Sequence, residues 1–264
     1  MYNIIYYTNC QYRGLHYFLQ KSIKNIKYTH LENYTLIKNK QTIPIDIMKQ
    51  ADIFIYQPID KKYGIYSTDT IIENNIMSYL PLNCKKISVP YIFHSSLWVF
   101  ALPAYGDIVG GRYSDFEYIG RESIINLKAN GYSLAEVLQL YSNGEIDFEY
   151  QNRFNKSIEI LKKKEEICDI KVSEFIEKNI RKHKLFYSCR HPTTCVFIHC
   201  VNQVLSILEY NDKYDEFSYP EDVSKIGSGP PHSSYDEKYW NFEYNNYKVD
   251  DNWYVNHIIN IYNQ

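Results

Sequence analysis

The sequence predicts an α/β protein with a doubly wound, mostly parallel sheet and helices on both faces. Three apolar runs rich in β-branched and aromatic residues suit buried strands, at residues 2–7, 51–58 and 86–93. Between them, apolar residues spaced three and four apart predict helices. Strands that alternate with helices are typical of a parallel sheet. With 264 residues, 45% of them hydrophobic and 23% charged, the chain is long enough to bury a full core.

The first structural unit combines a strand, a turn and a helix. The strand at 2–7 ends in a polar turn at 8–11, and a helix with apolar residues at helical spacing continues to Ile26. A second strand is then expected at 34–37. A short helix at 43–49 follows, beginning at a proline.

The middle of the chain repeats this alternation. The strand at 51–58 stops at a proline, as a strand leaving a parallel sheet often does. Thr70 and Glu73 have the spacing of a capping box and predict a helix through Tyr79. The strand at 86–93 follows and leads directly into a turn.

Residues 103–121 contain a proline, four glycines and several tyrosines, and we expect a loop there. A capping box formed by Ser133 and Glu136 opens a helix that Gly144 ends. Further helices are predicted at about 147–168 and at 173–183. These helices form an insertion over about 120–183.

A second strand, turn and helix come late in the chain. Residues 185–187 suit a brief strand, 188–192 a turn, and Thr193 the cap of an apolar helix. We therefore expect one α/β domain over 1–210. The irregular tail at 211–264, which includes a Gly/Pro loop at 227–232, should wrap this same domain.

Charge and cysteine usage exclude several classes of protein. The net charge is −2, from 29 basic and 31 acidic residues, so no strong positive field favours nucleic acid or an anionic membrane. The six cysteines lack zinc-site or Cys-x-x-Cys spacing, which favours a reduced, cytoplasmic protein without a metal. No signal peptide is expected, because no basic region precedes the first apolar run and Asn9 breaks that run. No integral membrane segment is expected, because no apolar run approaches about 18 residues.

Cys10 is a candidate nucleophile. It follows the first strand and precedes the first helix, where unpaired N–H groups and the helix dipole can lower the pKa of a thiol and hold an oxyanion. The alternative is a small thiol that fills a tight turn. His191 occupies the equivalent turn late in the chain, between a strand and a helix cap.

Ligands bind beyond the carboxyl ends of the strands in an open α/β sheet. Gln57 and the loop with Lys61 and Lys62 should therefore lie on the same edge as Cys10. A solvated loop is the alternative for the two lysines.

The chain resembles the WcbI family of polysaccharide-biosynthesis acetyltransferases. The resemblance rests on Thr-Asn-Cys-Gln at 8–11, on the apolar run at 51–58 and on the block at 157–208, which includes His-Pro-Thr at 191–193. It covers about residues 2–210 and leaves out the tail. The order and spacing of these motifs, more than any one of them, carry the likeness.

The resemblance implies an SGNH-hydrolase-like fold, binding of coenzyme A and acetylation of sugars for surface glycans. Cys10 takes the place of the nucleophilic serine of SGNH enzymes, and His191 that of the base. Ser188 stands where an aspartate would orient the base. A hydroxyl cannot stabilise an imidazolium as a carboxylate does, so this departure weakens an ordinary triad.

The expected function is therefore an acetyl-CoA-dependent acetyltransferase acting on a hydroxyl or amine of a sugar or nucleotide-sugar. The acetyl group could pass through Cys10 or go directly to the acceptor, with His191 as general base. The backbone N–H groups of Cys10 and Gln11, with the side chain of Asn9 or Gln57, are the expected oxyanion donors.

Other residues are expected to hold the substrates. Arg13, Lys61, Lys62 and Tyr63 are candidates for the coenzyme A site, and His94 could shape the acceptor pocket or simply pack. An SGNH-type esterase or thioesterase, and a non-catalytic protein that binds coenzyme A or a glycan, stay open as alternatives. The acceptor and the oligomeric state stay open as well, and a homo-oligomer is compatible with the sequence.

Overall fold

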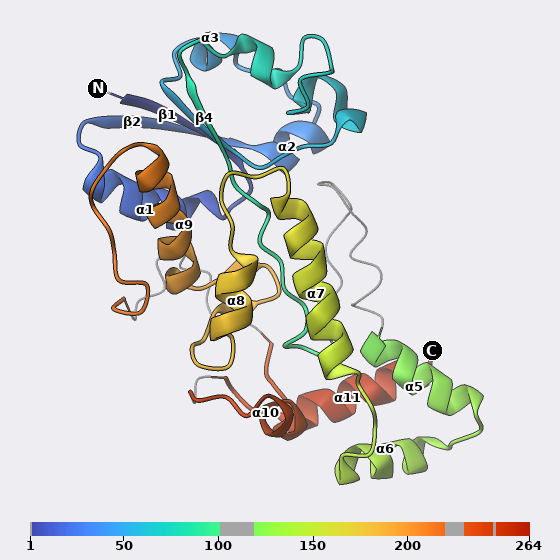
Figure 1. The fold of residues 1–264 in the computed structure, drawn as a ribbon. Coiled ribbons are helices and arrows are strands. Elements are labelled where there is room, and N and C mark those ends of the chain that lie inside the picture. The colour runs from blue at the N-terminus through green and yellow to red at the C-terminus, as the bar shows by residue number, and fades with distance from the viewer. Residues whose placement is uncertain (1, 101–118, 220–229, 245–246) are drawn as a thin grey trace.

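A computed structural model describes residues 2–100, 119–219, 230–244 and 247–264 of the protein (Figure 1). Four strands form one sheet in the order β2-β1-β3-β4, and every neighbouring pair is parallel. The strands are β1 (Tyr2–Thr8), β2 (Ile26–Glu32), β3 (Ile53–Tyr56) and β4 (Lys85–Ser88). The predicted parallel α/β fold is confirmed.

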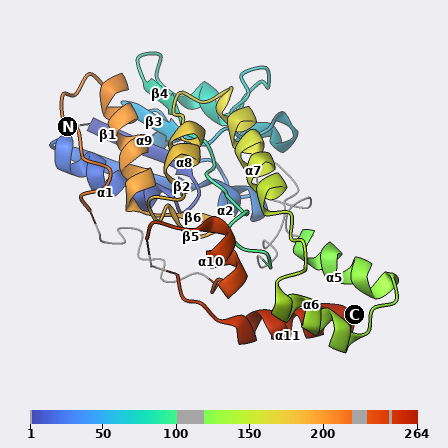
Figure 2. The ribbon, with the colours of Figure 1, turned by 60° about the horizontal axis from the view of Figure 1, so that its bottom comes forward.

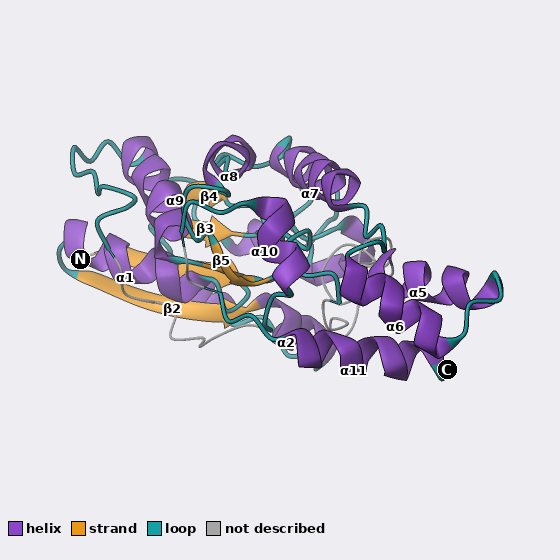
Figure 3. Ribbon diagram, turned by 90° about the horizontal axis from the view of Figure 1, so that it is seen from below, coloured by secondary structure: helices purple, strands orange, loops and turns teal. Residues whose placement is uncertain are grey.

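Helices account for most of the remaining described chain (Figure 3). The α-helices are α1 (Tyr12–Ser22), α2 (Asn33–Lys38), α3 (Ile45–Met48), α5 (Ile119–Ala129), α6 (Leu134–Asn143), α7 (Tyr150–Glu165), α8 (Ser173–Asn179), α9 (Thr194–Ile207), α10 (Ser234–Trp240) and α11 (Asp251–Tyr262). Two 3-10 helices are η1 (Lys61–Tyr66) and η2 (Ile76–Tyr79). A small antiparallel hairpin pairs β5 (Phe186–Ser188) with β6 (His191–Pro192).

The two faces of the sheet bury two separate cores because successive side chains of a strand point to opposite faces. Ile4 and Tyr6 of β1 belong to the core that includes α1 and α9, whereas Ile5 and Tyr7 belong to the core that includes α2 and α3. All four side chains are at most 2% exposed. Helices therefore cover both faces, as a doubly wound sheet requires.

The insertion and the tail build a helical lobe beside the sheet (Figure 1, Figure 2). The α7 helix begins in this lobe and ends near β4, and α11 packs against α5 and α6. Trp240, Tyr254 and Ile258 of the tail are each at most 1% exposed. The tail thus contributes to the core of the lobe, while the division into a 1–210 domain and a tail stays a prediction.

The strand predicted at 34–37 is wrong, because these residues belong to α2. The Asn33 side chain accepts a hydrogen bond from the backbone N–H of Tyr34 at 2.7 Å, and Thr35 donates to the Glu32 carboxylate. Side chains that bond nearby backbone in this way favour turns and helix starts. The second strand instead lies at 26–32, paired with β1 along its whole length.

The helix predicted from Thr70 to Tyr79 is also wrong. Asn75 interrupts it, since its side chain donates to the carbonyl of Asp69 at 2.6 Å and accepts from the N–H of Ser78 at 3.2 Å. Only the 3-10 helix η2 follows. By contrast, the capping box of Ser133 and Glu136 is confirmed, as is the left-handed Gly144 that ends α6.

The strand predicted at 86–93 is shorter than expected and ends at Ser88. The backbone N–H and the hydroxyl of Ser88 both donate to Asp169 Oδ2 at 2.7 Å, which joins the strand end to the chain after α7. The loop predicted at 103–121 lies outside the described residues up to 118, and α5 begins at Ile119. The Gly/Pro loop at 227–232 lies outside them up to 229.

Candidate functional site

The Cys10 turn lies at the point where the sheet reverses its winding. After β1 the chain passes to β2 on one side, and after β2 it crosses to β3 on the other side of β1. Ligands of open α/β sheets bind at such switch points. Asn9 follows β1 and Gln57 follows β3, and the backbone N–H of Asn9 donates to Gln57 Oε1 at 2.9 Å. The ends of the two strands are thereby held together.

The Gln11 side chain joins this turn to the hairpin that carries His191. It is 4% exposed, and its Nε2 donates to the carbonyls of Ile92 at 2.8 Å and Arg190 at 2.9 Å. Its Oε1 accepts from Gln57 Nε2 at 3.2 Å and from the N–H of Ile92 at 3.3 Å. The Cys10 turn and the β5–β6 hairpin that carries His191, far apart in sequence, are therefore adjacent. The turn predicted at 188–192 is wrong in its extent, because Ser188 and His191 pair as strand residues and only Cys189 and Arg190 form the turn.

The hairpin holds the His191 ring in a defined orientation. Ser188 and His191 face each other across the β5–β6 pair, and Ser188 Oγ lies 2.7 Å from His191 Nδ1. The hydroxyl can fix the ring tautomer, but it carries no charge with which to stabilise an imidazolium. The backbone N–H of His94 donates to the carbonyl of Cys189 at 2.9 Å and holds the tip of the hairpin from below.

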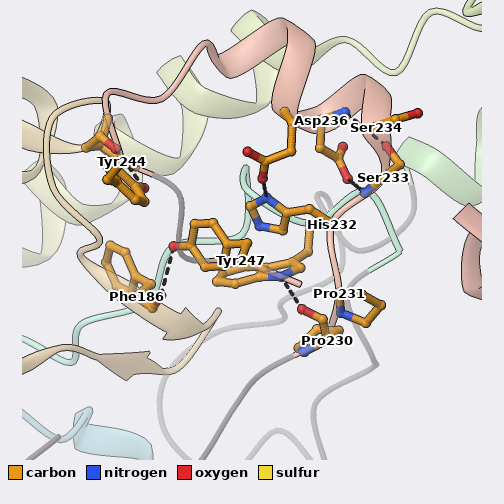
Figure 4. A network of polar contacts seen from close by, with 12 residues as sticks. Phe186, Pro230, Pro231, His232, Ser233, Ser234, Asp236, Tyr244 and Tyr247 are labelled. Carbon is orange, nitrogen blue, oxygen red and sulfur yellow. Dashed lines mark hydrogen bonds and ion pairs between the residues drawn. The ribbon is translucent and has the colours of Figure 1, made fainter. Parts of the chain in front are cut away.

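The C-terminal tail supports the same hairpin (Figure 4). Tyr247 donates its hydroxyl hydrogen to the carbonyl of Phe186, in β5, at 2.8 Å. The His232 ring stacks on Tyr247 at 3.8 Å between centroids and is held by Glu237 at 2.8 Å. Tail residues thus help to fix the strand that leads to Ser188.

Burial and one neighbouring carboxylate make the Cys10 thiol less reactive. Burial raises the pKa of Cys10, and the Glu32 carboxylate raises this pKa further, although Arg13 and Arg190 lower it. The expectation of a lowered pKa is wrong because burial, together with the Glu32 carboxylate, outweighs the Cys10 backbone N–H and the two arginines, which lower the pKa. The first helix starts at Tyr12 with Gln11 as its N-cap, so Cys10 lies just before the cap.

Two of the four expected oxyanion donors are already used within the protein. The Gln11 N–H donates to Asn9 Oδ1 at 2.9 Å, and Gln57 Nε2 lies 3.2 Å from Gln11 Oε1 and 3.4 Å from Asn9 Oδ1. The expectation that Gln11 and Gln57 contact substrate is therefore corrected, because both hold the scaffold. Within the described residues, the N–H of Cys10 and the Nδ2 of Asn9 donate to no other residue.

His94 does not line the site. Its side chain is fully buried, its Nε2 lies 2.6 Å from Ser96 Oγ, and its ring stacks on Phe186 at 5.2 Å. Burial, with a smaller contribution from the Arg153 charge, lowers the pKa of His94 to about 3. The expectation that His94 shapes the acceptor pocket is thus replaced by a role in packing behind the hairpin.

The candidate coenzyme A residues lie on exposed surface at this edge of the sheet. Arg13 is exposed on the first turn of α1, and Lys61 and Lys62 are exposed on η1. The ammonium of Lys62 lies 5.2 Å from the centre of the Tyr63 ring. Because η1 packs against α2, which follows β2, these cations and the Cys10 turn share the edge.

Sequence reasoning missed three residues beside Cys10. Glu32 ends β2, and placing that strand correctly would have put its carboxylate at this edge. His30 lies 3.1 Å from the carbonyl of Thr8 and stacks on Tyr12 at 3.6 Å. Arg190, between Ser188 and His191 in sequence, was visible as a cation in the predicted turn.

The described residues leave little space beneath the Cys10 turn, and they contain neither a metal-binding cluster nor a membrane-spanning helix. The cavity directly beneath the turn, between Gln11 and Phe197, measures about 10 Å³, room for about one water molecule. In the described ranges, no group of three or more His, Cys, Asp or Glu side chains is arranged to hold a metal ion. No helix in these ranges is long and apolar enough to cross a membrane.

The fold and the site define a parallel α/β protein in which a cysteine turn at the switch point of the sheet is joined to a hairpin that carries a histidine. The sequence matches the family described as polysaccharide biosynthesis enzyme WcbI over residues 3–213. The chain belongs to this family, as the resemblance of its motifs predicted. No curated protein matches the sequence.

A solved structure of a WcbI protein has the same fold. The TM-score is 0.68 at 16% sequence identity, and the alignment covers 100% of this chain and 90% of the other. That protein is described as a novel polysaccharide biosynthesis enzyme, in a native form without a disulfide bond between coenzyme A and one of its cysteines.

Proposed function

We propose that the protein is an acetyltransferase that moves the acetyl group of acetyl-CoA to a hydroxyl or amine of a sugar or nucleotide-sugar. The observation that carries this proposal is the Gln11 side chain, which holds the Cys10 turn against the hairpin of Ser188 and His191. Membership of a polysaccharide-biosynthesis family supports a sugar acceptor. The solved WcbI structure is described in terms of coenzyme A and one of its cysteines, which supports acetyl-CoA as the acyl donor.

His191 acts as the general base in this proposal. Ser188 holds Nδ1 at 2.7 Å, so that the other ring nitrogen can take the proton of the acceptor hydroxyl or amine. The acceptor oxygen or nitrogen then bonds to the acetyl carbonyl carbon, and the bond from that carbon to the sulfur of coenzyme A breaks. The proton passes from His191 to the departing thiolate.

Direct transfer is favoured over an acetyl-cysteine intermediate. The raised pKa of Cys10 leaves its thiol protonated near neutral pH, and a thiol is a much weaker nucleophile than a thiolate. Cys10 then lines the acyl site and contributes its backbone N–H. With the Asn9 amide, this N–H can stabilise the negative charge that develops on the carbonyl oxygen.

The cations at the edge fit the phosphates of coenzyme A. Arg13, Lys61 and Lys62 are exposed and can pair with phosphate oxygens, and Tyr63 offers a ring beside Lys62. Replacing both Lys61 and Lys62 by glutamine should raise the KM for acetyl-CoA and leave kcat nearly unchanged.

Release of the coenzyme A thiol, followed with and without a panel of sugars and nucleotide-sugars, tests the proposal. Release should depend on an acceptor, His191→Gln should lower kcat about 100-fold or more, and Cys10→Ala should retain most activity. Release at an equal rate without acceptor would instead identify a thioesterase. An acetyl group found on Cys10 by intact mass within one turnover would show the covalent route.

A further inference from the structure

A cleft lies in the helical lobe, separate from the Cys10 edge. It has a volume of about 770 Å³ and is lined by residues at the end of α6, in the loop at 144–149, in the first turn of α7 and in α10. Figure 2 shows where these helices lie in the fold. Pockets of about 300–1,000 Å³ are the ones that hold small organic ligands. The α7 helix starts at this cleft and runs 16 residues, about 24 Å, toward the end of β4. No lining residue comes from the Cys10 turn or the β5–β6 hairpin.

Aromatic rings form the floor and one wall of the cleft. Tyr235 and Tyr239, four residues apart on α10, are half-buried, and Tyr141 and Tyr150 are buried beneath them. Tyr150 and Tyr239 stack with centroids 4.4 Å apart and an interplanar angle of 17°, while Tyr141 and Tyr235 meet edge to face at 5.2 Å. The half-buried rings of Tyr235 and Tyr239 leave part of their apolar surface open to the cleft, which suits the C–H surface of a sugar.

The rim of the cleft is rich in hydrogen-bond acceptors and negatively charged. Glu145, Asp147 and Glu149 provide three exposed carboxylates, against the single ammonium of Lys238 among the lining residues. Carboxylates accept hydrogen bonds from sugar hydroxyls and pair with protonated amino groups. The same charge repels phosphates and uronic acids, so coenzyme A and sugar diphosphates fit this cleft poorly.

The loop that shapes the cleft is held in an unfavourable backbone conformation. Glu149 has a φ of 51°, in the left-handed region that a residue with a side chain seldom adopts. Gly144 has a φ of 71°, and a Cβ atom there would lie 2.6 Å from the Tyr235 ring. Only glycine therefore allows Tyr235 to take its place at the wall of the cleft.

We propose that this cleft binds an oligosaccharide that is neutral or carries free amino groups, at a site separate from the Cys10 edge. The cleft combines aromatic rings that can contact the C–H groups of a sugar with carboxylates that can bind its hydroxyl and amino groups. The loop at 144–149 shapes the cleft. The inference concerns binding alone and stands independently of the proposed acetyl transfer.

Calorimetric titration of the full chain with three trisaccharides tests the proposal. The probes are a trimer of glucosamine, maltotriose and a trimer of galacturonic acid. The first two should bind, the glucosamine trimer more tightly, and the galacturonic acid trimer should not. Absence of binding by both of the first two at millimolar concentration, or equal binding of all three, overturns the proposal.

Variants locate the bound sugar. Tyr239→Ser and Glu145→Lys should each weaken binding of the glucosamine trimer about tenfold. Glu159→Lys, which makes the same charge change at an exposed position of α7 outside the cleft, should leave binding unchanged. Circular dichroism confirms that each variant is folded, and the exposed position of Glu145 keeps the test valid if Tyr239→Ser does not fold.

Competition with coenzyme A distinguishes this cleft from the Cys10 edge. Saturating coenzyme A should not displace the glucosamine trimer, and Cys10→Ala should bind it as the native chain does. Displacement by coenzyme A, or equal weakening by Glu145→Lys and Glu159→Lys, would place the sugar elsewhere and overturn the proposal. A failure of acetyl transfer alone would leave these binding results unaffected.

Discussion

Replacing Gln11 with leucine should separate the two turns of the candidate site. Leucine has a similar volume but removes four hydrogen bonds, to the carbonyls of Ile92 and Arg190, to the N–H of Ile92 and to the Gln57 amide. Each lost bond costs about 1 kcal/mol, and up to about 3 kcal/mol where the partner stays buried and unpaired. The free energy of unfolding should therefore fall by about 4 kcal/mol.

The same change should reduce turnover more than substrate binding. If the hairpin moves by about 1 Å relative to Cys10, the rate of the chemical step falls about 100-fold, because the reacting groups lose their alignment. The KM for acetyl-CoA should change little, since the exposed cations of the edge are not displaced. Urea unfolding measures the stability, and thiol release at low temperature, where the variant stays folded, measures kcat and KM.

Gln20→Leu is the matched control for this prediction. Gln20 is an exposed glutamine on the same helix, α1, so the substitution makes the same chemical change without loss of a buried hydrogen bond. Amide exchange at residues 188–191 should accelerate in Gln11→Leu and stay unchanged in Gln20→Leu. If the two variants were equally stable and active, the positioning role of Gln11 would be refuted.

Three further predictions concern charge and capping. Glu32→Gln should lower the pKa of Cys10 and speed alkylation of its thiol by iodoacetamide at pH 7.5, whereas Arg190→Gln should slow this alkylation. Alkylation rates that move in the opposite directions would contradict these assignments. The pKa of His94 is about 3 in the folded protein and about 6.5 in an unfolded chain. Above pH 6.5 His94 is neutral in both states and adds no pH dependence to stability. As the pH falls below 6.5, the unfolded chain takes up a proton that the folded chain excludes, so the folded protein loses stability. Between pH 7 and pH 5 the native protein should lose about 2 kcal/mol of unfolding free energy that His94→Gln does not lose, as urea titrations at both pH values will show, and parallel losses would refute the assignment. Glu165 is 4% exposed and accepts hydrogen bonds from two backbone N–H groups at the start of α8, at 2.5 and 2.8 Å. Glu165→Ala should therefore lower the free energy of unfolding by about 3 kcal/mol, and with it the melting temperature. A change below about 1 kcal/mol would show that water replaces the cap.

The apolar runs predicted most of the sheet but not its edge. The runs that became β1 and β3 are continuous because both strands are buried on both faces. The strand at 26–32 is an edge strand with exposed Lys27 and Tyr28, so its sequence lacks such a run. The apolar residues at 34–37 were taken as the strand in its place, although Asn33 and Glu32 direct the chain into a helix.

The sequence predicted the local setting of Cys10 but not that of His191, and their roles in a site stay predictions. Cys10 follows β1 and precedes α1, a local pattern that sequence reveals, whereas His191 lies in β6 of a hairpin that was expected to be a turn. The Gln11 backbone N–H and the Gln57 side chain were expected to face substrate, and instead both are engaged in hydrogen bonds of the scaffold. The partners of the Gln57 side chain come from a distant segment, so its direction could not be inferred from its neighbours in sequence.

The contact between Gln11 and the Arg190 carbonyl spans 179 positions of the chain. Closing so long a loop costs entropy, and it requires that the sheet, the insertion and the hairpin strand be made first. While the chain is being synthesised, the Cys10 turn exists long before the histidine that faces it. A chain that stops within the insertion would thus carry the Cys10 thiol without the proposed base, and the candidate site would be completed only once the hairpin after the insertion has been made.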